Sequence, residues 1–569
     1  MRWSGLLSTS KYLLACATGL ALVACSTVSS PGGSINSRQA AVAMPDKFGA
    51  DVSEYILQQG GNAVDAAIAS GFALAVTFPE AGNIGGGGFM LIRMKDENVF
   101  LDYREKAPAM ASRDMYLDSS GNVIDKASLI GSKSAGVPGT VAGFWAAHQR
   151  FGSLPWRDLV KPAIALAEDG FVMPKKLADD IADTRDWFGT RTNFFNYFGN
   201  TPAGSVFRQP ELADTLRRIA DNGPAGFYAG KTAQLITAQM KRGGGGLISV
   251  EDLAAYEPVW REPLVADWRQ YTLISAPPPS SGGFAVIQLL KMKDRLASEF
   301  DGVAHNSDQY VHLVAEIEKR VFADRAEYLG DPDFIDVPLA QLIDERYIHS
   351  RADEVNTQTI SPVESVPPGL ESKDTTHYSI VDADGNAVSN TYTINWHFGS
   401  GVVVEGAGFI LNNEMDDFSV KPGVPNVYGV VGNTANEIQP GKRMLSSMSP
   451  TILVRNNKVN LVVGTPGGST IFTSVFQAIS NVLDFNMSPQ EAVDASRFHH
   501  QLLPPDLVTY SPSRPLAEDV QKTLTSRGYN VKPHAWEFGD LQLIYRDGNA
   551  LKPASDSRGR GASRVIEVQ

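Results

Sequence analysis

The spacing of hydrophobic and polar positions divides the chain into a helical first part and a strand-rich last part. From Asp46 to Val76 apolar residues recur at helical spacing, with a Gly-Gly-Asn break between two predicted helices. Helices are also predicted over much of 136–260 and 305–328. Beyond residue 374, alternation predicts strands at HYSIVD, AVSNTYTI, GVVVEG, TILVRN and KVNLVVGTP, a helix near 472–484, and closing strands at YNVKPH and LQLIYRD. The pattern predicts one α/β unit with a sheet-rich C-terminal third.

One predicted strand begins abruptly at Thr375-Thr376. The stretch before it, 356–374, has no periodicity and contains three prolines, which predicts an exposed loop. The sequence DADGN, which follows HYSIV, begins like a calcium-binding loop. Ala387 stands where such a loop needs glycine, and no glutamate closes it, so DADGN is interpreted as a hairpin turn.

Two glycine-containing motifs resemble phosphate-binding loops without meeting their requirements. Gly85–Gly88 precede the predicted strand FMLIRM, whereas a phosphate loop places its glycines after a strand and before a helix. In AGFYAGKT, Ala225 takes the place of the first glycine, and the preceding segment is helical. We therefore expect no nucleotide site, and we interpret the four glycines as allowing close backbone approach.

The N-terminal segment predicts export. An apolar run from Tyr12 to Ala24 is too short to span a membrane and is typical of a signal peptide over 1–24. It ends in Leu-Val-Ala-Cys, a sequence like the bacterial lipobox, in which Cys25 would be lipidated. An ordinary secretory signal with a chance cysteine is the alternative. Residues 25–37 are rich in serine and glycine and are interpreted as a tether, and the predicted location is the periplasm.

Composition excludes several classes of function. The net charge of −13 and the lack of a basic block argue against nucleic-acid binding. Both cysteines, Cys16 and Cys25, lie in the leader, so we expect neither an intrachain disulfide nor a cysteine zinc site. No other apolar run is long enough to cross a membrane, which leaves the possible lipid anchor as the one predicted membrane attachment.

Thr375 is a candidate nucleophile on chemical grounds. A threonine hydroxyl is a poor nucleophile without a neighbouring base, and His377 is the one histidine nearby in the sequence. Two adjacent threonines are also ordinary strand-forming sequence. The residues by themselves leave both interpretations open.

The chain resembles the gamma-glutamyltranspeptidase family over nearly its whole length after the leader. The resemblance is carried in the family's order by the segments DYREKAP, AGVPGTVAGF, GPAGFYAG, PPPSSGG, DTTHYSIVDADGN, NNEMDDFS, PNVYG, KRMLSSMSPTI, GTPGGS, RFHHQ and ASDSR.

The resemblance implies an N-terminal-nucleophile hydrolase with a four-layer αββα sandwich, an α/β (α+β) fold formed by two subunits cut from one precursor. Cleavage would fall between Asp374 and Thr375, giving a large subunit, 38–374, and a small catalytic subunit, 375–569, which remain associated as a heterodimer. The freed α-amino group of Thr375 would serve as the base for its own hydroxyl. The abrupt start of the predicted strand would then be the start of a mature subunit.

The resemblance also assigns roles to residues at matching positions. Thr393 would hydrogen-bond the nucleophile, and the amides of Gly467 and Gly468 would form the oxyanion hole. Tyr428 would belong to a lid over the site. The substrate's α-carboxylate and α-ammonium would be bound by Arg104, Ser446, Ser447, Asn395, Glu414 and Asp417.

The implied reaction takes a γ-glutamyl group from glutathione or another γ-glutamyl amide and passes it to water or to an amino acid or peptide, without a metal or organic cofactor. Trp396 and His397 replace small polar residues of some relatives, which bears on specificity. His499 and His500 in RFHHQ are interpreted as structural residues at a helix end. Two alternatives remain: a glutaryl-type cephalosporin acylase of the same superfamily, and a non-catalytic substrate-binding lipoprotein.

Overall fold

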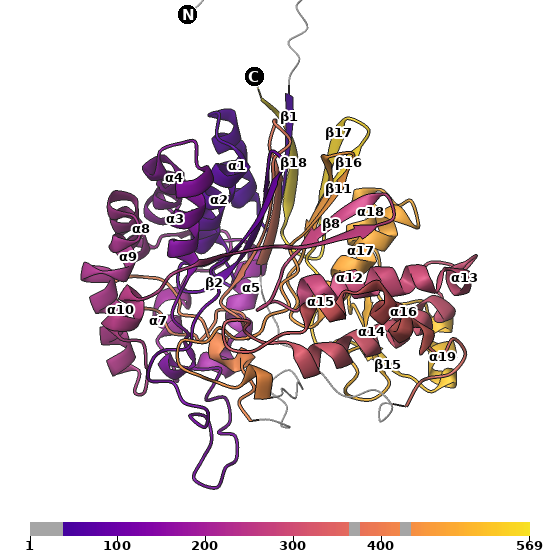
Figure 1. The fold of residues 1–569 in the computed structure, drawn as a ribbon. Coiled ribbons are helices and arrows are strands. Elements are labelled where there is room, and N and C mark those ends of the chain that lie inside the picture. Colours follow the sequence, from indigo (N-terminus) through magenta and orange to yellow (C-terminus); the bar gives the residue numbers. More distant parts are fainter. Residues whose placement is uncertain (1–37, 363–375, 422–433, 569) are drawn as a thin grey trace, which may run out of the picture. The chain divides into compact units, whose positions relative to one another are not determined.

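Two antiparallel sheets form the centre of the fold (Figure 1). The computed structural model describes residues 38–362, 376–421 and 434–568. The seven-stranded sheet has the order β18 (Ala562–Val568), β1 (Arg38–Met44), β9 (Thr376–Val381), β10 (Ala387–Thr393), β2 (Gly87–Met94), β3 (Glu97–Asp102), β6 (Val259–Arg261). The six-stranded sheet has the order β17 (Ala550–Ser555), β16 (Gln542–Asp547), β12 (Lys458–Gly464), β11 (Thr451–Arg455), β8 (Tyr271–Ser275), β7 (Leu264–Trp268).

Helices cover the outer face of each sheet. A hydrophobic cluster joins the seven-stranded sheet to α1 (Lys47–Gln58), α2 (Ala63–Thr77), α3 (Thr140–Phe151), α4 (Trp156–Asp169), α5 (Lys175–Asp183), α6 (Arg185–Phe188), α7 (Phe194–Phe198), α8 (Pro210–Asn222), α9 (Ala225–Tyr228), α10 (Gly230–Arg242) and α11 (Val250–Ala254). A second cluster joins the six-stranded sheet to α12 (Gly282–Arg295), α13 (Ala297–Phe300), α14 (Asp308–Tyr328), α15 (Leu339–Leu342), α16 (Glu345–Asp353), α17 (Thr470–Leu483), α18 (Pro489–Asp494) and α19 (Glu518–Arg527).

A third apolar cluster lies between the two sheets. It combines Ala43 and Phe89 of the seven-stranded sheet with Ile274, Ile452 and Val462 of the six-stranded sheet, all fully or almost fully buried. Both sheets therefore have two covered faces, which explains why β9 and β10 are buried along their whole length. The order helix, sheet, sheet, helix confirms the predicted four-layer αββα architecture.

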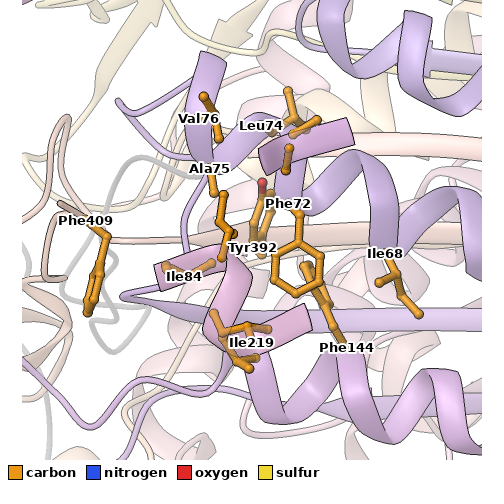
Figure 2. Close-up of a cluster of buried hydrophobic side chains, with 14 of the residues drawn as sticks. Ile68, Phe72, Leu74, Ala75, Val76, Ile84, Phe144, Ile219, Tyr392 and Phe409 are labelled. Carbon is orange, nitrogen blue, oxygen red and sulfur yellow. The ribbon is translucent and has the colours of Figure 1, made fainter. Parts of the chain in front are cut away.

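Helix α2 shows how the sequence fixes one of these layers. Asn62 caps its start by accepting hydrogen bonds from Val64 N (2.9 Å) and Asp65 N (3.0 Å), and the Asp65 carboxylate accepts one from Asn62 N (3.0 Å). All fifteen residues of the helix are buried, because alanines let it approach its neighbours closely. Figure 2 shows Phe72 of this helix beside Phe144 of α3, whose ring lies edge-on at 5.2 Å between centroids, and near Tyr392 of β10. This packing anchors the strand that ends at Thr393.

Most helices and strands predicted from the sequence are confirmed, and three details are wrong. The segment GVVVEG is not a strand: Val403 exchanges both backbone hydrogen bonds with the side chain of Asn193, and Gly401 and Gly406 have positive φ that turns the chain. The chain closes with β17 and β18 after LQLIYRD, and β1 precedes the first predicted helix. RFHHQ lies in the short strand β13 (Phe498–His499) rather than at a helix end.

The remaining strands lie outside the two main sheets. These are β13, β14 (Leu507–Tyr510) and β15 (Asn530–Pro533) in one small sheet, and β4 (Phe171–Val172) and β5 (Val206–Phe207) in another. Within the described ranges, none of the helices is both long and apolar enough to cross a membrane.

The segments before and after residue 374 interleave in one sheet. Strand β1 pairs with β18 on one side and with β9 on the other, and β10 pairs with β2. The predicted subunit boundary therefore does not coincide with a boundary between structural domains. Two subunits cut at that point would remain joined through backbone hydrogen bonds and a shared core.

Candidate active site

The hairpin of β9 and β10 forms the middle of the seven-stranded sheet. Its last described pair joins Thr376 to Tyr392, so the hairpin brings the residue after Thr375 opposite the residue before Thr393. Four predicted site residues, Asp374, Thr375, Tyr428 and Cys25, lie outside the described residues.

Thr393 is held at the end of β10 by contacts on both its backbone and its side chain. Its carbonyl accepts a hydrogen bond from Asn83 Nδ2 (2.8 Å), and its Oγ1 accepts one from Asn395 N (2.7 Å). A Cβ added to Gly86 would lie 2.0 Å from the Thr393 carbonyl oxygen. The glycine run therefore permits close backbone approach, as the sequence predicted, and the approach is to the predicted catalytic strand.

Asn395 connects this strand to the acidic segment. It has a left-handed backbone, φ 72°, and its Nδ2 donates to the Asn413 carbonyl at 3.1 Å. Asn413 Oδ1 in turn accepts from Trp396 N at 3.0 Å. These bonds bring Asn395 beside Asn413, the residue that precedes the 3₁₀ turn Glu414–Asp417.

Arg104 lies at the centre of a buried charged cluster. It follows β3, and its side chain is 1% exposed. Its two terminal nitrogens donate to Glu414 Oε1 and Asp417 Oδ2. The carbonyls of Met444 and Leu445 lie 3.4 Å from Nε and Nη2 respectively. The structure thus brings together three of the residues assigned to the two charged groups of the substrate.

Three carboxyl groups surround the single guanidinium of Arg104 in this cluster. Glu105 is a third buried carboxylate, with Oε2 3.6 Å from Arg104 Nη1. Burial raises the pKa of Glu105 to about 8 against the opposing effect of Arg104, and burial also raises the pKa of Glu414 well above its usual range. Among the described residues, Glu414 Oε2 has no hydrogen-bond partner. The cluster can therefore accept an additional cation, such as an ammonium group.

The two serines are positioned beside Arg104 by the loop Pro277–Gly283. The Ser446 amide donates to the Pro279 carbonyl (2.8 Å), and the Ser446 carbonyl accepts from Ser281 N (2.7 Å). Ser447 Oγ accepts a hydrogen bond from Arg325 Nη2 at 3.3 Å. The serines directly follow Leu445, whose carbonyl lies 3.4 Å from Arg104 Nη2.

Gly467 and Gly468 precede the N-terminus of α17. Both have positive φ, 133° and 57°, and their carbonyls accept from Thr470 N and Ile471 N, each at 3.1 Å. Within the described residues, neither glycine amide donates a backbone hydrogen bond. Free amides at the positive end of a helix suit the stabilisation of a developing oxyanion.

The histidines near the site are structural. His377 is fully buried between the sheets, with Nδ1 2.8 Å from Thr391 Oγ1 and Nε2 3.0 Å from Ser379 Oγ. Burial lowers the pKa of His377 to about 3, which keeps the ring neutral. In the described part of the chain no three His, Cys, Asp or Glu side chains gather as a metal site would require, and His499 and His500 bond to protein groups.

Sequence reasoning missed three supporting residues. Asn83 anchors Thr393, Glu105 adds charge beside Arg104, and Arg325 bonds both Ser281 Oγ (2.8 Å) and Ser447. Glu105 lies within the motif DYREKAP and could have been found there. Asn83 and Arg325 are far along the chain from their partners and carry no local signal.

Comparison with known proteins matches the chain to the family model described as gamma-glutamyltranspeptidase over residues 49–566. A glutathione hydrolase proenzyme of Pseudomonas aeruginosa is 59% identical over 527 residues, covering 93% of this chain and 94% of that protein. A solved gamma-glutamyltranspeptidase from Pseudomonas nitroreducens, complexed with L-DON, is 56% identical with a TM-score of 0.56, covering 57% of this chain and 97% of that chain. A solved cephalosporin acylase from Bacillus halodurans is 28% identical with a TM-score of 0.80, and the match covers 95% of this chain and 99% of that chain.

Proposed function

This chain belongs to the gamma-glutamyltranspeptidase family, and from that premise we propose that it is a self-processing γ-glutamyl acyltransferase and hydrolase. Its donor is glutathione or another γ-glutamyl amide. Its acceptor is water, an amino acid or a peptide.

The observation that carries the proposed substrate is the buried cluster around Arg104. A γ-glutamyl group bears a carboxylate and an ammonium on its α-carbon. The guanidinium of Arg104 offers a planar pair of donors suited to the carboxylate. Glu414 Oε2 is buried and has no hydrogen-bond partner in the described part of the chain, so it offers an acceptor to the ammonium. An entering γ-glutamyl group would supply one charge of each sign to groups that now pair with each other.

Thr375 is the proposed nucleophile. Cleavage of the Asp374–Thr375 bond frees its α-amino group, which takes the hydroxyl proton as Oγ1 attacks the γ-carbonyl carbon. Thr393 orients that hydroxyl, and the amides of Gly467 and Gly468 stabilise the oxyanion. The amine product leaves, and the threonine ester then passes its γ-glutamyl group to water or to an amine. Tyr428 is proposed as the lid residue.

The decisive experiment combines processing with turnover. Thr375→Ala should give one uncleaved band on a denaturing gel and no hydrolysis of γ-glutamyl-p-nitroanilide, whereas wild type gives two bands and turnover. Thr376→Val is a matched control, because Thr376 is buried and its hydroxyl makes no hydrogen bond to the described residues. Unprocessed wild type without activity would support the binding-lipoprotein alternative, and turnover by Thr375→Ala would refute the proposed nucleophile.

A glutaryl-type acylase is the second candidate, favoured by the structural likeness to the cephalosporin acylase. Glutaryl groups lack the α-ammonium and would leave Glu414 Oε2 without a partner. Comparing kcat/KM for γ-glutamyl and glutaryl anilides separates the two, and we expect the γ-glutamyl substrate to be preferred by about tenfold or more.

Export and assembly complete the proposal. Residues 1–24 form a signal peptide, Cys25 receives a lipid, and the periplasmic enzyme consists of a large subunit to Asp374 and a small subunit from Thr375. A two-chain mature form is supported by the solved relative, whose chain is almost wholly matched yet covers 57% of this one. Mass spectrometry of the purified protein would test both new N-termini and the lipid.

A further inference from the structure

A cavity lined by charged and apolar residues opens beside Gly467 of the proposed oxyanion hole. Its volume is about 120 Å³, and it is lined by Glu80, Lys176, His397, Gly467, Asp540 and Arg558 among others. None of Arg104, Glu414 or Asp417 lines it. The cavity and the Arg104 cluster are therefore separate spaces, and Gly467 connects the cavity to the proposed reaction centre.

The cations of this cavity are already paired with protein groups. Lys176 Nζ lies 3.1 Å from Asp180 Oδ1, and Arg558 Nη1 lies 2.9 Å from Asp556 Oδ2. Arg560 does not line the cavity, and its Nη2 donates to Glu80 Oε1 at 2.6 Å and to the Thr77 carbonyl at 3.0 Å. A ligand carboxylate would have to displace one of these partners.

Two carboxylates of the cavity retain capacity to accept hydrogen bonds. Glu80 is 5% exposed, and its Oε2 has no hydrogen-bond partner among the described residues. The Asp540 side chain accepts one hydrogen bond within the same residues, from Gln542 Nε2 at 3.0 Å. A buried carboxylate oxygen without a partner is costly, and a ligand that donates hydrogen bonds and carries positive charge would relieve that cost.

We propose that this cavity is the binding site for the amino group of the acceptor substrate, held as its ammonium between Glu80 and Asp540. The inference rests on the proposed function and assigns a binding site to the acceptor, which is the second substrate of that reaction. The cavity has the volume of about four water molecules, enough for the amino end of an amino acid or dipeptide and too little for a whole peptide. The rest of the acceptor extends through the mouth, where His397 is exposed.

The position of the cavity suits the transfer step. The bound ammonium gives one proton to Glu80, which passes it to solvent. The amine nitrogen then forms a bond to the γ-carbonyl carbon held as the Thr375 ester. The ester C–O bond breaks, and Thr375 Oγ1 takes the second proton from the nitrogen. Hydrolysis uses water at the same carbon and does not need the two carboxylates.

The test compares transfer with hydrolysis in Glu80→Gln and Asp540→Asn. Both substitutions keep an oxygen for Arg560 or Gln542. We expect the KM for glycylglycine as acceptor to rise about tenfold or more, while hydrolysis of γ-glutamyl-p-nitroanilide without acceptor stays within about twofold of wild type. Asp179→Asn is the matched control, because Asp179 lies on the same helix, pairs with Lys175 at 2.6 Å and does not line the cavity; its acceptor KM should not change.

Equal loss of hydrolysis and transfer in a correctly cleaved variant, or an unchanged acceptor KM, would overturn the inference.

A competition experiment on the wild-type protein tests the inference even if the variants do not fold. N,N-dimethylglycine carries one ammonium N–H and cannot form a stable acyl product, so it should compete with glycylglycine and leave the KM for the donor unchanged. Competition with the donor instead would place it in the Arg104 cluster and refute the assignment. If the wild-type protein does not hydrolyse γ-glutamyl-p-nitroanilide, the proposed function is refuted. If wild type hydrolyses it and the variants keep the wild-type KM for glycylglycine, this inference alone is refuted.

Discussion

The Arg104 cluster and the cavity at Glu80 are both rich in carboxylates, and they differ in what their cations do. In the cluster, one buried guanidinium bonds directly to Glu414 and Asp417, so cation and anions together match a zwitterion. In the cavity, Lys176 and Arg558 pair with other protein carboxylates, and Glu80 Oε2 has no hydrogen-bond partner among the residues that the structure describes. The number of acidic residues therefore does not define specificity, because the groups left unsatisfied decide which ligand charge is bound.

The largest expected effect comes from removing the cation of the cluster. Arg104→Gln should lower kcat/KM for γ-glutamyl-p-nitroanilide by about 10²–10³-fold, because it deletes one partner of a buried hydrogen-bonded charge cluster. Arg104→Lys keeps the charge without the planar fork and should recover part of the loss. Steady-state kinetics on correctly cleaved protein measures both, and full activity of Arg104→Gln would contradict the assignment.

A smaller effect is expected from removing one anion of the cluster. Glu414→Gln should lower kcat/KM for γ-glutamyl substrates by about 10–100-fold, because the α-ammonium loses a charged acceptor. Glutaryl substrates lack that ammonium and should not lose rate. The ratio of the two anilides is the readout, and an equal loss with both would argue against contact between Glu414 and the ammonium.

A change in pH should alter the binding of the acceptor in the cavity more than it alters the rate of hydrolysis. Burial, and then the neighbouring charge of Asp556, raise the pKa of Asp540 to about 8, while Arg497, Lys176 and Arg560 oppose this. Below that pH the carboxyl is protonated and binds an ammonium more weakly. Because the α-amino group of glycylglycine also titrates near pH 8, the readout is the inhibition constant of N,N-dimethylglycine, whose ammonium stays charged, and we expect that constant to fall by up to about tenfold as pH rises through 8. Asp540→Asn should lose this component, and an identical profile in the variant would assign the titration to another group.

The smallest effect concerns stability. The folded pKa of Asp540, about 8, lies above the usual value of 3.8, so the folded state binds the extra proton between these limits. Its contribution to stability is complete below about pH 4 and is lost as pH rises to about 8. The Tm difference between Asp540→Asn and wild type should therefore shift in favour of the variant by about 1–2 °C over that range. Paired scans at pH 5 and 8.5 measure it, with Asp179→Asn, which does not line the cavity, as control.

The sequence predicted most of the longer helices, the strands β2, β9–β12, β15 and β16, and Arg104, Glu414 and Asp417 of the cluster, since periodicity and dense motifs are local properties. The strands that it did not predict include β1 and β18, which are short segments from opposite ends of the described chain that form strands by pairing with each other. It also predicted a strand at GVVVEG, where the side chain of Asn193 takes the backbone hydrogen bonds. Apolar runs report burial, whereas pairing depends on which partner the fold supplies.

The candidate site shows the same division. Arg104, Glu414 and Ser446 stand in recognisable motifs, so the sequence by itself determined which chemical groups are present. Only the tertiary structure decided that Asn83 supports Thr393, that Glu105 adds a buried charge, and that Glu80 shares a cavity with Asp540. The physical reason is that charge recognition depends on distance and on which hydrogen bonds remain unmade. Both are set when segments hundreds of residues apart pack together.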